Sequence, residues 1–259
     1  MKKSEFPEKA YEILVDSTLL SMGFDIYVPS QTKEAKLGYD ALFQHGKFKV
    51  GFFQYKIVKE YHRIPYYHCF APKAFKFDLH FTLRNKYLQH NILVRKNKGG
   101  LFACYLVPLF VRYKDLYDYY HNGSLVTSNS VALKPIHTIN DTKYHYITFD
   151  NKPFALQHSK EAMNVECLNI NELKHLIKQT NSITKEELTN NVLEDFYEIF
   201  KEIKTETKDE YFDGKIKTLQ NIMIKNSNVK NLEEQKEELA IKLLSECGIF
   251  LGVIKDNNE

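Results

Sequence analysis

One stretch of the chain, GYDALFQHGKFKVGFFQYK at residues 38–56, constrains the fold more than any other. It predicts two strands joined by a tight turn. The second strand is apolar around Gln54, which is typical of a strand in the middle of a sheet. Because side chains alternate along a strand, Gln54 and Lys56 are expected on one face, and the hairpin register brings Asp40 to the same end. Two polar side chains on one face of an apolar strand need a reason.

Regular elements are predicted on both sides of this hairpin. A helix is expected before it, and Pro7 suits the first turn of that helix. After it, FKFDLHFTL alternates strictly, as a half-buried strand does, and LFACYLVP is a continuous apolar strand. The order helix, strand, hairpin, strand, helix, strand indicates an α/β or α+β layer fold. The predicted ranges are helix 7–22, strand 24–29, strand 75–83, helix 85–99 and strand 101–108.

The second half of the chain divides into a mixed part and a helical part. Residues 112–121 predict a helix, and residues 124–133 and 143–149 predict strands. A helix capped by Asn169 or Asn171 follows. From residue 181 onward, apolar residues recur at helical spacing. We therefore expect a domain at 1–180 with a strand-rich extension and an all-helical region at 181–259, with helices near 184–203, 208–226 and 231–246.

Charge is distributed unevenly between these parts. Residues 1–100 hold 17 Lys and Arg against 9 Asp and Glu, whereas residues 181–259 hold 11 against 17. A basic N-terminal part suits a polyanionic substrate, because phosphate contacts dominate nucleic-acid affinity. The acidic part suits a protein partner or a contact between two copies of the chain. The alternative is that both parts are simply solvated surfaces.

Several classes of protein have no support in the sequence. The four cysteines are single and scattered, so we expect reduced, mostly structural residues and no thiolate zinc site. No apolar run reaches membrane-spanning length and the N-terminus has no apolar signal region, so no membrane association and a cytoplasmic location are expected. There is no phosphate-binding loop, dinucleotide fingerprint or hydrolase elbow, which argues against a nucleotide cofactor.

Three strings of the N-terminal part carry a resemblance. YEILVDSTLLSMGF, in which Glu12 precedes Gly23 by eleven positions, resembles the first helix and strand start of Mrr-like restriction endonucleases of the PD-(D/E)xK nuclease superfamily. LGYD resembles the Gly-x-Asp of that family, and FFQYK resembles the Gln-x-Lys variant of its (D/E)-x-K motif. The resemblance covers roughly residues 6–58. It implies a restriction-endonuclease-like core, with a central mixed sheet flanked by helices.

The resemblance implies a role for each matching residue. Asp40 would be the main metal ligand, Gln54 would supply a side-chain oxygen, and the carbonyl of Tyr55 would complete the inner shell. Glu12 would bind a metal directly or through water. Lys56 would position the attacking water and offset charge at the scissile phosphate. Because Gln54 is neutral, metal binding would depend more on Glu12.

The chemistry of these residue types is consistent with that assignment. Mixed oxygen ligands suit Mg²⁺ or Mn²⁺, and such ions promote attack of water on a phosphodiester. Further basic residues are candidates for contacts with nucleic acid. For His90, the alternative is a packed residue, and for the lysines it is a solvated one. These nucleic-acid-binding candidates are Lys33, Lys36, Lys47, Lys49, Lys59 and His90.

Three functions remain open on the sequence. The first is a metal-dependent endonuclease that hydrolyses DNA phosphodiester bonds in restriction or defence against foreign DNA, with a homodimer or another protein partner held through the C-terminal helices. Its setting rests on the resemblance alone. The second is a catalytically inactive nuclease fold that binds or senses nucleic acid, which the neutral Gln54 favours. The third is an RNA-cleaving nuclease, since nothing in these residues reads a 2′-hydroxyl.

Overall fold

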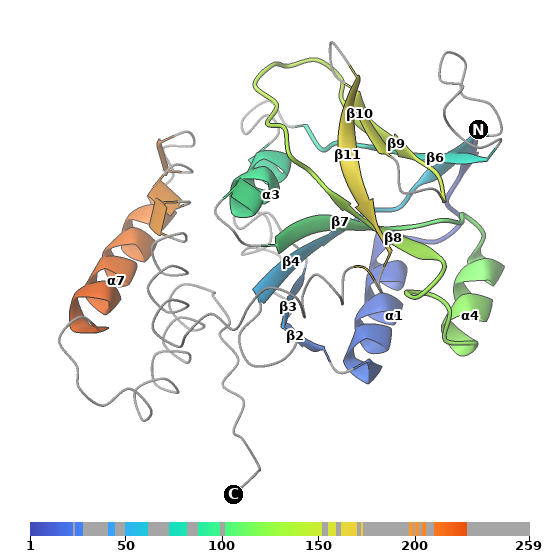
Figure 1. Ribbon diagram of the computed structural model, residues 1–259, viewed down its shortest axis with the longest axis horizontal. Coiled ribbons are helices and arrows are strands. Elements are labelled where there is room, and N and C mark those ends of the chain that lie inside the picture. Colours follow the sequence, from blue (N-terminus) through green and yellow to red (C-terminus); the bar gives the residue numbers. More distant parts are fainter. Residues whose placement is uncertain are drawn as a thin grey trace, which may run out of the picture.

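A computed structural model of the chain describes residues 1–22, 24–27, 41–44, 50–61, 73–81, 88–98, 102–151, 155–158, 162–169, 172, 197–198, 200–201, 204–205 and 210–226 (Figure 1). Within these residues, eleven strands form one sheet, in the order β1-β5-β6-β9-β10-β11-β8-β7-β4-β3-β2. The strands are β1 (Lys2–Lys3), β2 (Asp25–Tyr27), β3 (Ala41–Gln44), β4 (Val50–Tyr55), β5 (Lys59–Tyr61), β6 (Ala74–Asp78), β7 (Phe102–Pro108), β8 (Ser130–Lys134), β9 (Tyr146–Phe149), β10 (Ala155–His158) and β11 (Ala162–Leu168).

The sheet is mixed. Strands β2, β3 and β4 form an antiparallel meander, and β4 then pairs in parallel with β7. Every other pairing among the described strands is antiparallel. The sheet curls, so that β11 runs across the direction of β7 (Figure 1). The parallel pair requires a crossover connection, and α3 (Leu88–Lys98) lies immediately before β7 in that connection.

Helix α1 (Glu8–Ser21) covers one face of the meander. It begins after Pro7, whose extended backbone (φ −73°, ψ 154°) ends the preceding segment. Tyr11, Val15 and Leu19 are fully buried at four-residue intervals and form the packed stripe of the helix. They join Phe53, Tyr55, Cys104 and Leu106 in a buried group that we name the α1 cluster.

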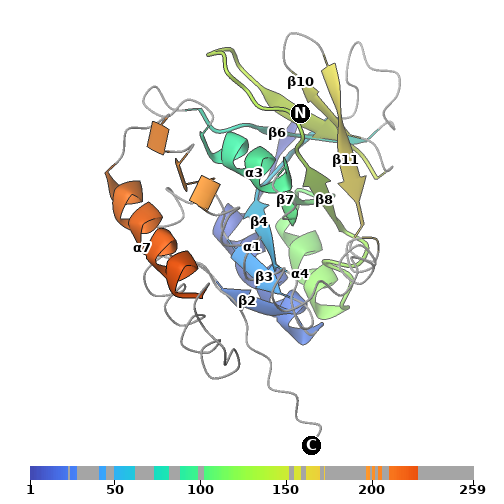
Figure 2. The same cartoon turned by 60° about the vertical axis from the view of Figure 1, so that its left-hand side comes forward.

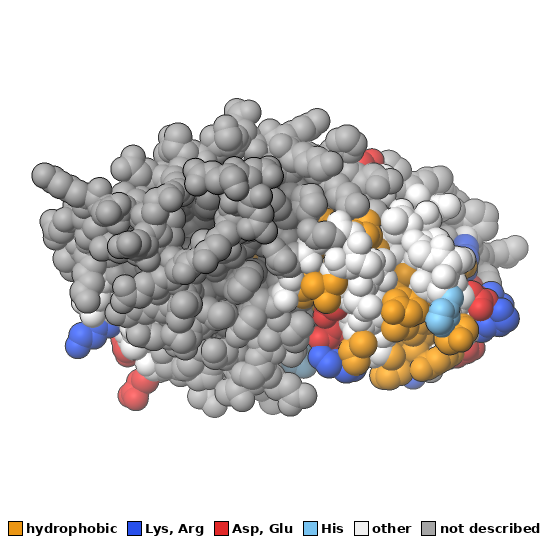
Figure 3. All heavy atoms as spheres, turned by 90° about the horizontal axis from the view of Figure 1, so that it is seen from below, with side chains coloured by type: hydrophobic (Ala, Val, Ile, Leu, Met, Phe, Trp, Pro, Cys, Tyr) orange, Lys and Arg blue, Asp and Glu red, His pale blue; other side chains and the backbone are white. Residues whose placement is uncertain are grey.

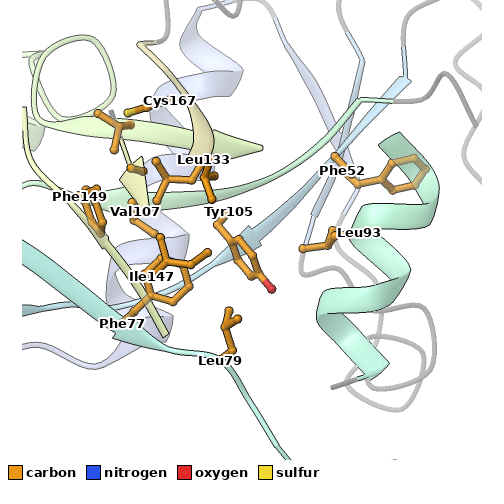
Figure 4. Close-up of a cluster of buried hydrophobic side chains, with 14 of the residues drawn as sticks. Phe52, Phe77, Leu79, Leu93, Tyr105, Val107, Leu133, Ile147, Phe149 and Cys167 are labelled. Carbon is orange, nitrogen blue, oxygen red and sulfur yellow. The ribbon is translucent and has the colours of Figure 1, made fainter. Parts of the chain in front are cut away.

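The opposite face of β4 packs against other residues. Phe52 belongs to a second buried group, the α3 cluster, which includes Leu93 of α3 and Tyr105 of β7. Figure 4 shows the side chains of this cluster converging inside the curl of the sheet. Neighbouring residues of β4 therefore serve different clusters, as strand alternation requires. Helices α1 and α3 lie on opposite faces of β4 and β7 (Figure 2).

Helices α1 and α4 (Tyr113–His121) form a pair that borders the α1 cluster. Helix α4 packs beside α1, and Ser17 Oγ lies 3.2 Å from the hydroxyl of Tyr120. The outer side of this pair exposes Ile13, Leu20 and Tyr117. Figure 3 views this side of the molecule and shows hydrophobic side chains gathered on it, next to basic and acidic ones. The helix pair thus presents an apolar outer surface.

The C-terminal part contributes to the core as well. Helix α7 (Tyr211–Asn226) confirms the helix predicted at 208–226. Phe200 and Leu219 are fully buried members of the α3 cluster, and the partly buried Ile216 packs against this cluster. The division of the chain into 1–180 and 181–259, with a partner or dimer contact in the second part, stays a prediction. No helix among the described residues is long and apolar enough to cross a membrane.

The α/β class predicted from the sequence is confirmed, and the principal elements of the first half lie close to their expected positions. The strand expected at 124–133 begins only at Ser130, because Leu125 and Val126 are buried within a turn instead. Asn169 and Glu172 exchange hydrogen bonds between side chain and backbone at 2.7 and 3.0 Å, which is the pattern of a helix capping box. The rest of that predicted helix lies outside the described residues.

Candidate functional site

Gln54 lies near the end of β4, in the middle of the sheet. It pairs with Tyr105 of the parallel strand β7, and alternation places it on the same face as Phe52. Only 1% of Gln54 is exposed. Among the described residues, no group lies within hydrogen-bonding distance of its side-chain oxygen Oε1. A buried carbonyl oxygen without a partner is rare in proteins and points to an unseen ligand, ion or water.

The next two residues of the chain contact carboxylates of α1. The fully buried Tyr55 donates a hydrogen bond from its hydroxyl to Asp16. Lys56 follows the last residue of β4, and its Nζ lies 3.2 Å from Glu8 Oε1. The backbone N–H of Ile57 donates to the other oxygen of Glu8 at 3.3 Å. The end of β4 is therefore tied to α1 at two points, Glu8 and Asp16, which lie about two helical turns apart.

Glu8, Glu12 and Asp16 recur every four residues, so they form one stripe on the surface of α1, which we name the acidic stripe. Glu12 is the middle member, and only 7% of it is exposed. Its carboxylate receives a hydrogen bond from Lys9 Nζ at 2.5 Å. The helix carboxylate that meets Lys56 is thus Glu8, one turn before the Glu12 singled out by the sequence.

The carboxyl group of Asp16 is perturbed by its surroundings. Its pKa is raised to about 6, mainly by burial and also by the nearby charge of Glu12, whereas the hydrogen bond from Tyr55 and the charge of Lys9 act in the opposite direction. A carboxyl group that titrates near neutral pH, beside other carboxylates, is a frequent feature of functional sites.

The sequence prediction missed both Asp16 and Glu8 as site residues. The signal for them was present, since the acidic stripe runs one position after the apolar row of Tyr11, Val15 and Leu19. Such a stripe beside a packed row lies at the border of the buried face. Its members are therefore held against the sheet and not directed into open solvent.

His90 and Lys59 are the nucleic-acid candidates that the structure describes. His90 is 1% exposed and lies on α3. Its Nε2 donates to the carbonyl of His137 at 2.8 Å, so its Nδ1 accepts from the hydroxyl of Tyr105 at 3.0 Å. Burial lowers the pKa of His90 to about 4, so the ring is neutral at physiological pH. His90 is an interior residue that contacts Tyr105, the register partner of Gln54, and we do not include it among the contacts to nucleic acid. Lys59 is partly exposed on β5.

The other predicted residues fall outside the described part of the chain. They are Asp40, Lys33, Lys36, Lys47 and Lys49. Ala41, which follows Asp40 in the sequence, is described and pairs with Phe53, the residue before Gln54. The start of β3 therefore lies beside the end of β4, at the position expected for the hairpin.

A group of three or more His, Cys, Asp or Glu that could hold a metal ion is not found among the described residues. The amide oxygen of Gln54 does not count toward such a group, because Gln is not one of these residue types. Asp40 does not count either, because it lies outside the described residues. A comparison with protein-family models, one with curated proteins and one with solved structures each found no match to this chain.

Proposed function

We propose that this protein is a metal-dependent endonuclease that hydrolyses phosphodiester bonds of DNA. The observation that carries the proposal is the end of β4. There, a buried amide oxygen without a partner is followed directly by a tyrosine and a lysine that contact carboxylates of α1. A role in restriction or defence against foreign DNA follows only from the resemblance to Mrr-like enzymes.

The arrangement of elements supports the proposal. The resemblance implies a helix, a first strand and a hairpin, continued by a later helix and strand in a mixed sheet. The chain has α1, the meander β2-β3-β4, then α3 and the parallel strand β7, in that order. We propose that these elements are a restriction-endonuclease-like core. On this view β1, β5, β6 and β8 to β11 are additions that extend the sheet.

The donor set fits Mg²⁺ or Mn²⁺. Both ions prefer oxygen ligands, and they retain several waters when the protein supplies few charges. Gln54 Oε1 is a buried oxygen with no partner among the described residues. Asp40 directly precedes Ala41, whose pairing with Phe53 brings the start of β3 to the end of β4 that carries Gln54. With the backbone carbonyl of Tyr55, these are the oxygens that we propose hold the ion. Glu12 does not belong to this set, because α1 packs on the face of β4 opposite to Gln54 and the Glu12 carboxylate pairs with Lys9.

When bound, a divalent ion activates water and stabilises the charge that develops on the phosphate. The residues of the chain supply the remaining functions. Lys56 is 16% exposed at its side chain, and Glu8 fixes its ammonium group at 3.2 Å. This holds a positive charge in a site of low solvent content, where it stabilises developing negative charge more strongly than in water. The hydrogen bond from Tyr55 to Asp16 fixes the end of β4 against α1.

A cleavage assay with purified protein tests the proposal. The wild type is expected to cleave duplex DNA in Mg²⁺ and not in EDTA. Asp40→Asn and Lys56→Met are each expected to lower the rate by roughly 100-fold or more, the usual effect of removing a group that stabilises the transition state. Lys114→Met is the matched control, because Lys114 lies on α4 with 76% of its side chain exposed.

The other two functions correspond to different outcomes of this assay. An inactive binding subunit would bind DNA in a salt-dependent manner but cleave it in neither Mg²⁺ nor Mn²⁺. An RNA nuclease would cleave RNA and leave DNA intact. Full activity in Asp40→Asn or Lys56→Met would show that the site lies elsewhere.

A further inference from the structure

Three lysines stand in register on three neighbouring strands. Strand β1 pairs with β5, and β5 pairs with β6. Lys3 is directly opposite Lys59, and Lys59 is directly opposite Lys76. Residues that are directly opposite in antiparallel strands point to the same face of the sheet. The three side chains therefore form one row, which we name the lysine row. Its steps are about 4.8 Å, the spacing between strands.

The lysine row concentrates positive charge. Like charges directly opposite each other in a sheet are destabilising, so such a row needs a compensating anion. Asp78 supplies part of it, with carboxylate oxygens 2.5 Å from Lys59 Nζ and 3.6 Å from Lys76 Nζ. The pKa of Lys76 is lowered, mainly by burial, and the charge of Lys59 contributes to the lowering. One carboxylate thus neutralises two of the ammonium groups only in part, and Lys3 is exposed at the end of the row.

An aromatic surface continues the row beyond Lys76. The ammonium group of Lys76 lies 3.9 Å from the ring centre of Tyr146 and 4.9 Å from that of Tyr144. Tyr144 is 59% exposed, and its hydroxyl donates to Asp78. Aromatic rings beside basic side chains are a common feature of surfaces that bind nucleic acid.

The lysine row is close to the candidate site along the chain. Lys59 follows Lys56 by three residues, and three residues span at most about 11 Å. Lys3 lies in the segment that leads directly into α1, and the N-terminus lies beside β6 in Figure 1. A nucleic-acid strand that reaches Lys56 is therefore within a few nucleotides of the row.

We propose that Lys3, Lys59 and Lys76 bind the phosphate backbone of DNA on one side of the scissile bond. The choice of DNA rests on the proposed function, whereas the row itself does not depend on catalysis. Contacts of lysine with phosphate position a nucleic acid without reading its sequence. Asp78 then has a second role, because it competes with phosphate for Lys59 and Lys76.

Binding without cleavage tests this proposal. The dissociation constant of a short fluorescent DNA duplex is measured by anisotropy in EDTA at several salt concentrations. Lys3→Gln and Lys59→Gln are each expected to reduce the slope of log K against log salt by about 0.9, the contribution of one phosphate contact. Asp78→Asn is expected to strengthen binding, because it frees two ammonium groups. Lys114→Gln on α4 changes the net charge equally and is expected to keep the wild-type slope.

The outcomes separate this proposal from the nuclease proposal. If Lys3→Gln and Lys59→Gln keep the wild-type slope, or if Lys114→Gln loses as much as they do, the row is not a DNA-binding surface. Unchanged or weaker binding by folded Asp78→Asn also overturns the proposal. If the row variants lose binding in EDTA while the wild type cleaves nothing in Mg²⁺, the nuclease proposal fails and the DNA contact stands.

Discussion

Replacing Gln54 by methionine should make the metal-free protein more stable and should remove its stabilisation by Mg²⁺. Methionine has nearly the shape of glutamine but no amide oxygen. Gln54 is 1% exposed, and its Oε1 has no partner among the described residues, so burying this oxygen costs about 1–3 kcal/mol in the metal-free protein. We therefore expect Gln54→Met to raise the free energy of unfolding in EDTA by about that amount. Each 1 kcal/mol corresponds to about 2–4 °C in Tm for a chain of this size.

Thermal unfolding in EDTA and across a Mg²⁺ titration measures both effects. Mg²⁺ should raise the Tm of the wild type and have little effect on Gln54→Met, because an ion that binds only the folded state stabilises it. Gln157→Met is the matched control. Gln157 is fully buried, and its Oε1 likewise has no partner among the described residues, but it lies on β10. The control should keep the wild-type Mg²⁺ shift. A lower Tm of Gln54→Met in EDTA, or a full Mg²⁺ shift in this variant, would refute the reasoning.

Three further variants probe the charges around the core. Because the pKa of Asp16 is raised in the folded protein, the contribution of Asp16 to the free energy of unfolding is fully present below pH 4 and is lost as the pH rises through about 6. Asp16→Asn should therefore remove a pH dependence of up to about 3 kcal/mol between pH 4 and 7, which urea unfolding measures. Tyr55→Phe should raise the pKa of Asp16 further, because it removes a hydrogen bond that favours the carboxylate, and NMR titration of the Asp16 carboxyl carbon would detect this. Burial lowers the pKa of Lys96 to about 7. The free energy of unfolding of the wild type, relative to that of Lys96→Met, should therefore increase from pH 7 to pH 10. Equal pH profiles of the two proteins in urea unfolding would contradict this.

Elements with a strong hydrophobic pattern could be predicted from the sequence. The apolar row of α1, the alternation of β6 and the continuous apolar run of β7 each lie close to their expected positions. In each of these elements the buried side chains share one face. The spacing of apolar residues within a short stretch of sequence is therefore enough to predict the element. The expected helix before β7 lies in the connection from β4 to β7, and these two strands pair in parallel.

Strands β1, β5, β10 and β11 could not be predicted. Strands β1 and β5 are two and three residues long and carry lysines. They form because β5 pairs with β6 and β1 pairs with β5. In β10, Gln157 and His158 are buried by neighbouring strands and not by their own hydrophobicity. Such strands depend on partners that are distant in the sequence.

The candidate site could be predicted only in part. The apolar surroundings of β4 single out Gln54 and Lys56, whereas only the resemblance implies a role for Tyr55. The structure locates all three residues at the end of β4 or directly after it. The contact of Lys56 with Glu8, in place of Glu12, could not be foreseen, because it depends on how far α1 is shifted along the sheet. Asp16 was missed because its partner, the hydroxyl of Tyr55, comes from a position 39 residues away.

The central claim is that the end of β4 holds a divalent ion next to Lys56. Diffraction from crystals grown with Mn²⁺ and measured for its anomalous signal tests this directly. We expect a peak about 2.0–2.2 Å from Gln54 Oε1, with a carboxylate oxygen of Asp40 also bound to the ion. A fully folded protein with no anomalous peak at Gln54, or with Oε1 hydrogen-bonded to another protein group, would contradict the account.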